Sequence, residues 1–398
     1  VKLTIEGDEV TYDFSGSHNT ISTLYNSAFG ATFSAVVAGM KTYFPDLPLN
    51  SGFYRPIKVI APKDSIVDAP WPTAVTGFLM PFEKIMNSTY EIWSSIMPER
   101  AIACTFNQEY LLTGGRDLRT ENKPIFMFYD WLPGGWGGRS NKDGCNSTTS
   151  CFGTGLQAQP VEGQERLSPI LANQMEIKCD SGGPGKYRGG AGVVKTSTLG
   201  KASDAVLSYI CDRERAITWG IKGGLPSMPQ GLWVKRADSG EKEWLGTIFS
   251  DLPIKEGDIF SRPTSGGGGL GDPLERDPEA VMRDVEQDYV SLDRARKDYG
   301  VVLSIIDIDL AKYTVDISAT TEARQEIAAK RREWIQEDPE DVAKRYRNGE
   351  ICELDMVRRY GVIVDWGTGE LMPKSTKQFR DSFIKRTAAY WNDDIINS

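Results

Sequence analysis

The chain has 398 residues, a formal net charge of −9 and a single histidine, His18. A hydrophobic content of 40% and a charged content of 25% are typical of a folded chain rather than a disordered one. The length suits two or three domains, or one large one. The acidic balance argues against nucleic-acid or anionic-membrane partners, and one histidine cannot complete a site that needs two or three imidazoles.

Six cysteines are scattered along the chain without a C-x-x-C pair, which is ordinary for a reduced protein and predicts a cytoplasmic location. No apolar run reaches the ~18–20 residues that span a bilayer. Residue 1 is Val rather than Met, and a strand pattern begins there at once. We therefore expect the chain to start inside a larger polypeptide.

The first part of the chain alternates short strands with two helices. Val10, Tyr12 and Phe14 alternate with polar residues after a Gly7-Asp8 turn, which predicts a hairpin. Apolar spacing predicts helices over 20–45 and 81–97, both ended by prolines, with short strands and turns over 50–76. A buried strand over 126–129 leads into a glycine-rich loop, 133–144.

Residues 158–275 are rich in strand patterns, and the composition then changes. Apolar or alternating runs recur at intervals of roughly ten residues, which suits an antiparallel sheet or barrel. The predicted strands are 191–198, 205–211, 231–236 and 244–249. Beyond Pro273 the spacing predicts a helix over 278–298.

Half of the residues between Glu322 and Arg359 are charged, with both signs mixed. Such a run is either a solvated helical face or an arm that lies on a partner subunit. Together these patterns predict an α+β fold with a β-rich antiparallel core, flanking helices and a charged, largely helical C-terminal extension. The predicted parts are 1–157, 158–275 and 276–398.

The pentapeptide Asp180-Ser181-Gly182-Gly183-Pro184 matches the nucleophile loop of chymotrypsin-like proteases. A serine nucleophile needs a histidine base within hydrogen-bond reach. His18 is the only histidine, and it follows a hairpin in a polar turn. We therefore reject a serine protease.

Glycine dominates residues 180–192, as it does where a chain turns through positive φ or where another backbone approaches closely. Lys186 and Arg188 add cationic donors that suit a carboxylate, bicarbonate or phosphate. The alternative is a turn between strands in which Arg188 points inward and pairs with Glu176 or Asp180.

Two further glycine clusters, 133–144 and 266–271, lack the Gly-Lys-Ser/Thr ending of a phosphate-binding loop and the spacing of a dinucleotide fold. We therefore predict no nucleotide site on this chain. We expect the glycine-rich loops to form the wall of a water-excluding chamber.

Several segments resemble the hydantoinase B/oxoprolinase family, the B-type subunits of hydantoinases, 5-oxoprolinases and ATP-dependent ketone carboxylases. The tail, Arg359 to Lys374, looks like the end of the large subunit of acetone and acetophenone carboxylases, as does Trp136-Gly137-Gly138-Arg139. The other segments that carry the resemblance are 12–17, 50–57, 179–190, 219–224, 266–278, 290–291 and 299–302.

The resemblance implies a hetero-oligomer in which an A-type subunit binds ATP and makes an activated phosphorylated species. The B-type subunit of a ketone carboxylase would then join an enol phosphate or enolate with carboxyphosphate or CO2, giving a 3-oxo acid. ATP, bicarbonate and a small ketone would be the reactants of that complex. Two alternatives stay open: ATP-dependent opening of a cyclic amide or imide, and a non-catalytic assembly role of residues 275–398.

The family's B-type subunits carry a His/Asp-rich metal-binding segment in an N-terminal half that would precede residue 1. We therefore expect a divalent metal in the complex, with its ligands outside this chain, on the same or a separate polypeptide. We also expect the chain to be inactive alone.

Carboxylation of an enolate needs a dry cavity with cationic or N–H donors for the developing charge. On that basis the predicted catalytic residues are Arg55, Asp143, Asp180 and Arg188. The predicted substrate-binding residues are Asp13, Gly135, Arg139, Ser181, Gly182, Gly183, Lys186 and Arg213.

Overall fold

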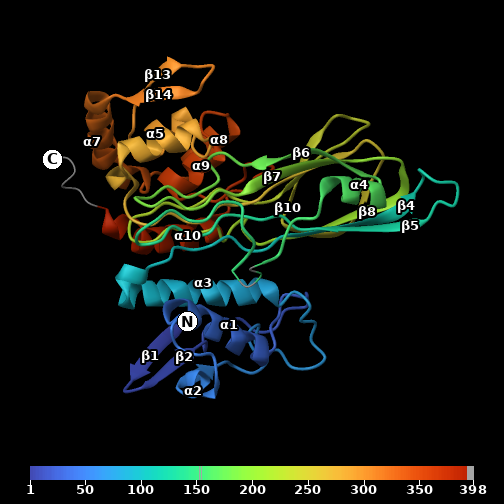
Figure 1. Cartoon of the computed structure of the whole chain (residues 1–398), viewed down its shortest axis with the longest axis horizontal. Helices are drawn as coiled ribbons and strands as arrows, with labels where there is room; N and C mark the ends of the chain where they lie inside the picture. The colour runs from blue at the N-terminus through green and yellow to red at the C-terminus, as the bar shows by residue number, and fades with distance from the viewer. Residues whose placement is uncertain (152, 154, 392–398) are drawn as a thin grey trace. The chain divides into compact units, whose positions relative to one another are not determined.

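The structure is a computed structural model that describes residues 1–151, 153 and 155–391. These residues fall into two compact units (Figure 1). The first unit is Val1–Ala103 with Ser150–Thr154, and the second is Cys104–Thr149 with Gly155–Ser398. The α+β fold class predicted from the sequence is confirmed. The three-part division of the sequence stays a prediction about domains.

The first unit packs two helices on a small mixed sheet. Strand β1 (Lys2–Glu6) pairs antiparallel with β2 (Glu9–Asp13), as the alternation predicted, and β2 pairs parallel with β3 (Ile57–Ile60). Helices α1 (Phe29–Tyr43) and α3 (Leu79–Ile96) bury the apolar face of β2. The short elements α2 (Ser51–Tyr54) and η1 (Pro98–Arg100) complete the unit.

The helix predicted over 20–45 begins only at Phe29. The buried side chain of Asn26 binds the backbone of Ile21 through both its oxygen and its nitrogen, at 2.9 and 3.0 Å. It also donates to the carbonyls of Thr23 and Ala74. These bonds stabilise a loop over 21–28, because asparagine competes with helical hydrogen bonding when its side chain reaches nearby backbone.

The second unit contains two antiparallel sheets packed face to face around one core (Figure 1). Leu111 and Phe128 from one sheet meet Leu199 and Phe260 from the other. One sheet has the order β10-β9-β12-β7-β6: Lys242–Gly246, Leu232–Lys235, Ile259–Pro263, Val193–Leu199 and Ile170–Ile177. The other has the order β11-β8-β4-β5: Ile248–Ile254, Ala202–Ile210, Tyr110–Asp117 and Ile125–Asp130.

The antiparallel pairing agrees with the predicted strands, but the single run expected over 244–249 is wrong. Gly246 adopts φ +72°, and the chain leaves β10 there to enter β11 in the opposite sheet. Glycine is the residue that takes this left-handed conformation without strain. Helix α4 (Val161–Leu167) lies before β6 and buries Gln164.

The C-terminal helices gather at one end of the second unit (Figure 1). The helix expected over 278–298 is two helices, α5 (Pro278–Glu286) and α6 (Leu292–Tyr299), because Asp288 has φ +58° and the Ser291 side chain caps a new N-terminus. The other elements are η2 (Pro273–Glu275), β13 (Leu303–Asp307), β14 (Lys312–Val315), α7 (Ile317–Trp334), α8 (Pro339–Arg347), α9 (Glu353–Asp355), the π-helix η3 (Met356–Tyr360), α10 (Pro373–Arg386) and η4 (Ala388–Tyr390).

The charge-rich stretch 322–359 is not simply a solvated face. Lys330 and Glu326 form an exposed pair at 2.9 Å, but Arg331 and Arg358 are buried. Arg331 pairs with Asp272 at 2.7 Å, and Arg358 pairs with Asp298 at 2.7 Å. The sequence pattern is the same for exposed and buried pairs, so part of the predicted surface is core. Among the described helices, none is long and apolar enough to cross a membrane.

Candidate functional site

The glycine-rich segments, which lie far apart in the sequence, run side by side in the second unit and are joined by backbone hydrogen bonds. The Gly190 N–H donates to the Trp136 carbonyl at 2.8 Å, the Gly267 N–H to the Gly190 carbonyl at 2.9 Å, and the Gly183 N–H to the Gly267 carbonyl at 2.7 Å. We call this arrangement the glycine bundle. It comprises residues 133–148, 180–192, 217–231 and 264–271.

The segments of the glycine bundle approach one another more closely than any residue with a side chain would allow. A Cβ atom added to Gly135 would lie 1.8 Å from the Gly190 carbonyl oxygen, and one added to Gly189 would lie 1.9 Å from the Gly267 oxygen. Between 181 and 192 no glycine has positive φ. Of the two roles considered for these glycines, close backbone approach is therefore the one the structure uses.

The expectation that these loops wall a chamber is wrong for the bundle itself. Its backbones occupy the space between neighbouring segments, so the glycines fill the interior instead of enclosing a void. Gly135, Gly182 and Gly183, predicted to contact substrate, lie within this packing, where the added Cβ atoms would meet backbone at 1.8–2.3 Å. Their predicted role in substrate binding stays untested.

Arg188 points inward, as the alternative interpretation held, but its partner was predicted wrongly. The side chain is only 3% exposed, and its Nε lies 3.3 Å from Asp284 Oδ1 in α5 rather than beside Glu176 or Asp180. Its Nη1 donates to the Gly189 carbonyl at 2.7 Å, and the guanidinium lies 4.8 Å from the Tyr289 ring centroid. The positive charge of Arg188 is therefore paired with a carboxylate of the same chain.

Asp143 joins the same network from the neighbouring glycine loop. It accepts from the Arg188 N–H at 2.7 Å and from both Nη atoms of Arg276 at 2.7 Å, while Arg276 also reaches Asp284 at 2.8 Å. Burial raises the pKa of Asp143, but the hydrogen bonds and charge of Arg276 outweigh it and hold that pKa below its ordinary value. Asp143 is thus an ionised tie between the bundle and α5.

The protease-like pentapeptide forms a structural turn. Asp180 has φ +62°, and its carboxylate accepts from the Ser291 N–H at 2.8 Å at the start of α6. The buried Ser181 hydroxyl donates to the Lys178 carbonyl at 2.6 Å and accepts from the Gly192 N–H at 2.8 Å. The Ser181 oxygen is held by backbone partners, in agreement with the rejection of a serine nucleophile.

Arg213 is fully buried and fixes a neighbouring backbone segment. Its Nη2 donates to the Thr105 carbonyl at 2.9 Å and to Asn107 Oδ1 at 2.7 Å, and its Nη1 donates to the Ala216 carbonyl at 3.2 Å. These contacts use the guanidinium inside the second unit. The predicted contact of Arg213 with substrate stays a prediction.

Two of the predicted cations remain accessible at the rim of the bundle. The Lys186 side chain is 48% exposed and lies 3.4 Å from Glu275. Arg139 is partly exposed, and its guanidinium lies 5.6 Å from the Trp136 ring centroid. Their loops adjoin, because a Cβ on Gly138 would lie 2.4 Å from the Tyr187 carbonyl oxygen.

The remaining two predicted residues, Asp13 and Arg55, lie in the first unit. The Asp13 carboxylate accepts from the Ser15 N–H at 2.8 Å and from the Ser15 hydroxyl at 2.5 Å, and these bonds hold its pKa below its ordinary value. Arg55 is exposed at the end of α2. Their roles in catalysis and binding stay predictions.

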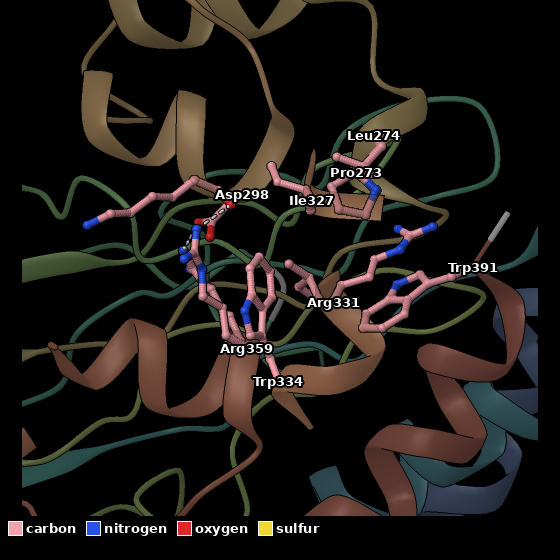
Figure 2. A pocket seen from close by; sticks show the side chains of 11 residues that line it. Pro273, Leu274, Asp298, Ile327, Arg331, Trp334, Arg359 and Trp391 are labelled. Carbon is pink, nitrogen blue, oxygen red and sulfur yellow. Dashed lines mark hydrogen bonds and ion pairs between the residues drawn. The ribbon is translucent and has the colours of Figure 1, made fainter. Parts of the chain in front are cut away.

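Figure 2 shows a pocket where α6, α7 and η3 meet the glycine bundle. Its volume is about 30 Å³, close to the space of one or two water molecules. Arg331 lies over the Trp391 ring at 4.6 Å, and Arg359 lies over the Trp334 ring at 4.7 Å. With Arg358 paired to Asp298, this is a packed junction of charged and aromatic side chains, too small for a substrate.

A second cavity in the same unit, of about 340 Å³, has the dimensions of a small-molecule site. We call it the aromatic cavity. Its walls come from the four strands β7, β9, β10 and β12, from two loops of the second unit, from α8 and α9, and from the turn at Trp366. The lining includes Lys178, Trp233, Lys242, Trp244, Tyr346, Glu353 and Trp366. Trp233 and Trp244 face each other on the paired strands β9 and β10, whereas Trp366 comes from the C-terminal part of the chain. No local pattern in the sequence indicates that Trp366 joins the other two.

Among residues 1–151, 153 and 155–391, no group of three or more His, Cys, Asp or Glu side chains is placed to hold a metal ion. The described residues therefore do not fit a resident metal. None of the six cysteines, all of which lie among the described residues, is in a disulfide.

Comparison with known proteins gives consistent matches. A family model described as hydantoinase B/oxoprolinase matches residues 1–273. "Uncharacterized protein MJ0963" of Methanocaldococcus jannaschii is 31% identical over 327 residues, 81% of this chain and 55% of that protein. The chain thus spans about half the length of the curated relatives it matches.

Two solved structures share the fold. The nucleotide-free structure of acetone carboxylase has a TM-score of 0.72 at 20% identity and covers 96% of this chain and 54% of its own. The structure of ATP-dependent caprolactamase from Pseudomonas jessenii has a TM-score of 0.68 at 25% identity and covers 81% of this chain and 55% of its own. The first likeness extends over nearly the whole chain.

Proposed function

Because the chain belongs to the hydantoinase B/oxoprolinase family, we propose that it is part of the B-type subunit of an ATP-dependent ketone carboxylase. In this proposal an A-type partner subunit uses ATP to activate the reactants, and bicarbonate supplies the carbon. The B-type subunit joins the activated ketone to that carbon and forms a 3-oxo acid. A divalent metal belongs to the proposed complex, with ligands outside the described residues.

The observation that carries the proposal is the extent of the shared fold. The acetone carboxylase structure covers 96% of this chain and the caprolactamase structure 81%, while the family model ends at residue 273. The charged helical tail is the part of the chain that lies beyond the family model. Because the likeness to acetone carboxylase covers 96% of the chain, it extends over most of that tail, which supports the carboxylase over the hydrolase.

The proposed chemistry is the attack of an enolate on CO2. Carboxyphosphate, made from bicarbonate and ATP, releases CO2 and phosphate, and the ketone gives its α-proton to a base in the complex. The electron pair left on the α-carbon forms the new C–C bond to CO2, and the electron pair of one C=O bond of CO2 becomes the charge of the product carboxylate. Such a step is assisted by fixed cationic donors in a site that excludes water. Lys186 and Arg139, accessible at the rim of the rigid bundle, are the residues of this chain that the proposal assigns to those anions.

A second function is favoured by the caprolactamase structure, which shares 25% identity over 81% of this chain. In that case the subunit would complete the ATP-dependent opening of a cyclic amide. The two reactions differ in their second reactant, because ring opening needs water whereas carboxylation needs bicarbonate.

The test is substrate-dependent ATP consumption by the full-length protein co-purified with its A-type partner. We expect ATP hydrolysis to require a ketone and bicarbonate together, and labelled bicarbonate to enter an acid-labile 3-oxo acid. ATP hydrolysis with caprolactam or hydantoin, and none with ketones, would replace this proposal with the hydrolase.

Matched charge removals test the assigned residues in the same assay. Lys186→Met and Arg139→Met are each expected to lower kcat/KM by about tenfold or more, the loss typical of one charge-assisted hydrogen bond. Lys201→Met removes an exposed lysine between β7 and β8 and is expected to leave the rate unchanged. Equal rates for all three variants would refute the assignment.

A further inference from the structure

The aromatic cavity combines a wall of indole and phenol rings with charges of both signs. Trp233 and Trp244 meet at a centroid distance of 4.8 Å and an angle of 60°, and Tyr346 meets Trp366 edge to face at 6.0 Å. Rings arranged in this way present several aromatic surfaces to one cavity. A planar aromatic ligand gains most from such surfaces, through stacked and edge-to-face contacts.

The rings are held in place before any ligand arrives. Trp244 Nε1 donates to Glu214 Oε1 at 3.1 Å, and Trp366 Nε1 donates to the Glu214 carbonyl at 3.1 Å. A Cβ added to Gly231 would lie 1.9 Å from the Trp244 ring, so glycine is needed there for the indole to lie against the backbone. A preformed wall reduces the ordering cost of binding.

The charged groups of the cavity carry a net positive charge. Lys178 and Lys242 lie on its lining together with one carboxylate, Glu353. The Lys242 ammonium lies 4.4 Å from the Trp233 centroid and thus covers a ring face that a cationic ligand would need. Within the described residues neither lysine forms an ion pair, so both ammonium groups retain hydrogen-bonding capacity for an anion.

We infer that the aromatic cavity binds a planar aromatic carboxylate. The ring lies among the three tryptophans, and the carboxylate accepts hydrogen bonds from Lys178 and Lys242. The single negative charge of a carboxylate balances the net positive charge of the lining. A phosphate dianion would leave an uncompensated negative charge beside Glu353. The site stands on this lining whichever reaction the complex catalyses.

The tail beyond the family match completes the site. Tyr346, Glu353 and Trp366 all lie after residue 273, and they close the cavity over strands that lie within the matched region. The tail therefore supplies one wall of a binding site, in addition to the ion pairs that hold the tail to the glycine bundle.

The test compares two probes with the same ring and opposite charge, phenylacetate and 2-phenylethylamine, by titration calorimetry on the full chain. We expect saturable binding of phenylacetate and none of the amine. Binding of the amine alone would show a cation cage formed by the rings and Glu353, and would overturn the inference, as would no saturable binding of either probe.

Variants locate the bound acid. Lys178→Met and Lys242→Met are each expected to lower the affinity for phenylacetate by about tenfold or more. Glu353→Gln is expected to leave that affinity unchanged or to raise it. Lys201→Met, an exposed lysine outside the cavity, is the matched control. Unfolding midpoints equal to the wild type separate lost binding from lost folding, and unchanged affinity in both cavity variants would refute the site.

Discussion

The glycine bundle predicts that a single methyl group at Gly267 destabilises the second unit severely. A Cβ there would lie 1.9 Å from the Trp136 carbonyl oxygen and 2.5 Å from the Gly137 nitrogen, against an ordinary contact of roughly 3.5 Å. Movement of the segment would also strain two hydrogen bonds, from the Gly267 N–H to Gly190 and from the Gly183 N–H to the Gly267 carbonyl. Overpacking costs about 1–3 kcal/mol, and each lost hydrogen bond about 1 kcal/mol.

We therefore expect Gly267→Ala to lower the free energy of unfolding by about 3–5 kcal/mol. The same substitution at Gly163 is the control, because Gly163 lies in α4 of the same unit with no atom within 4 Å of an added Cβ. There the alanine is expected to be neutral or to stabilise the helix by up to about 1 kcal/mol.

Urea denaturation gives the loss of stability, and amide hydrogen exchange shows where it occurs. The amides of Gly183 and Gly267 should exchange much faster in Gly267→Ala, whereas those of Gly163→Ala should match the wild type. Equal urea midpoints for the two variants would refute the claim that the bundle is packed to backbone contact.

Two further predictions concern buried charges of the second unit. Arg358→Met leaves Asp298 without its 2.7 Å partner, removes donors to the Asp180 and Gly182 carbonyls, and should cost about 3–5 kcal/mol in urea denaturation. Adding Asp298→Leu should recover part of the lost stability. If the double variant instead lost as much stability as the two single variants together, the pairing would be contradicted. At the sandwich core, burial raises the pKa of Glu109 from 4.5 to about 7, although the charge of Arg262 lowers it. The folded state therefore keeps a proton that the unfolded chain releases, so this group's stabilisation is complete below about pH 4.5 and is lost as the pH rises to about 7. Glu109→Gln should flatten that slope between pH 4.5 and 7, and an unchanged slope would exclude the shift.

Local patterns in the sequence were sufficient for elements whose cause is local. The hairpin at 2–13 follows from strict alternation, and α3 follows from apolar residues at helical spacing before Pro98. Composition predicted two possible roles for the glycines of 180–192, positive φ or close backbone approach, and the structure selects the second.

Sequence patterns failed where the cause is a contact between distant residues. Arg188 was placed beside Glu176 or Asp180, whereas its carboxylate partner Asp284 is 96 residues away. The chamber predicted from the glycine loops is filled by their own backbones, and the aromatic cavity needs Tyr346 and Trp366 from the C-terminal part of the chain beside the strand residue Trp244. None of these pairings has a period or spacing along the chain.

The contact of backbone with backbone in the glycine bundle constrains where chemistry can occur on this chain. Backbone packed at these distances leaves no room for a ligand between segments, so groups that act on a ligand must lie at the rim of the bundle. Arg139 and Lys186 lie at that rim within their own segments, and Lys178 lies two residues before the segment 180–192. The bundle is tied to α5 by the buried Arg188–Asp284 ion pair, and to η3 by hydrogen bonds from Arg358 to the Asp180 and Gly182 carbonyls. These contacts hold the backbone that carries those cations. A catalyst that must hold an anion in place gains from such a support, and this is the physical reason to look for function at the rim rather than in the glycine loops themselves.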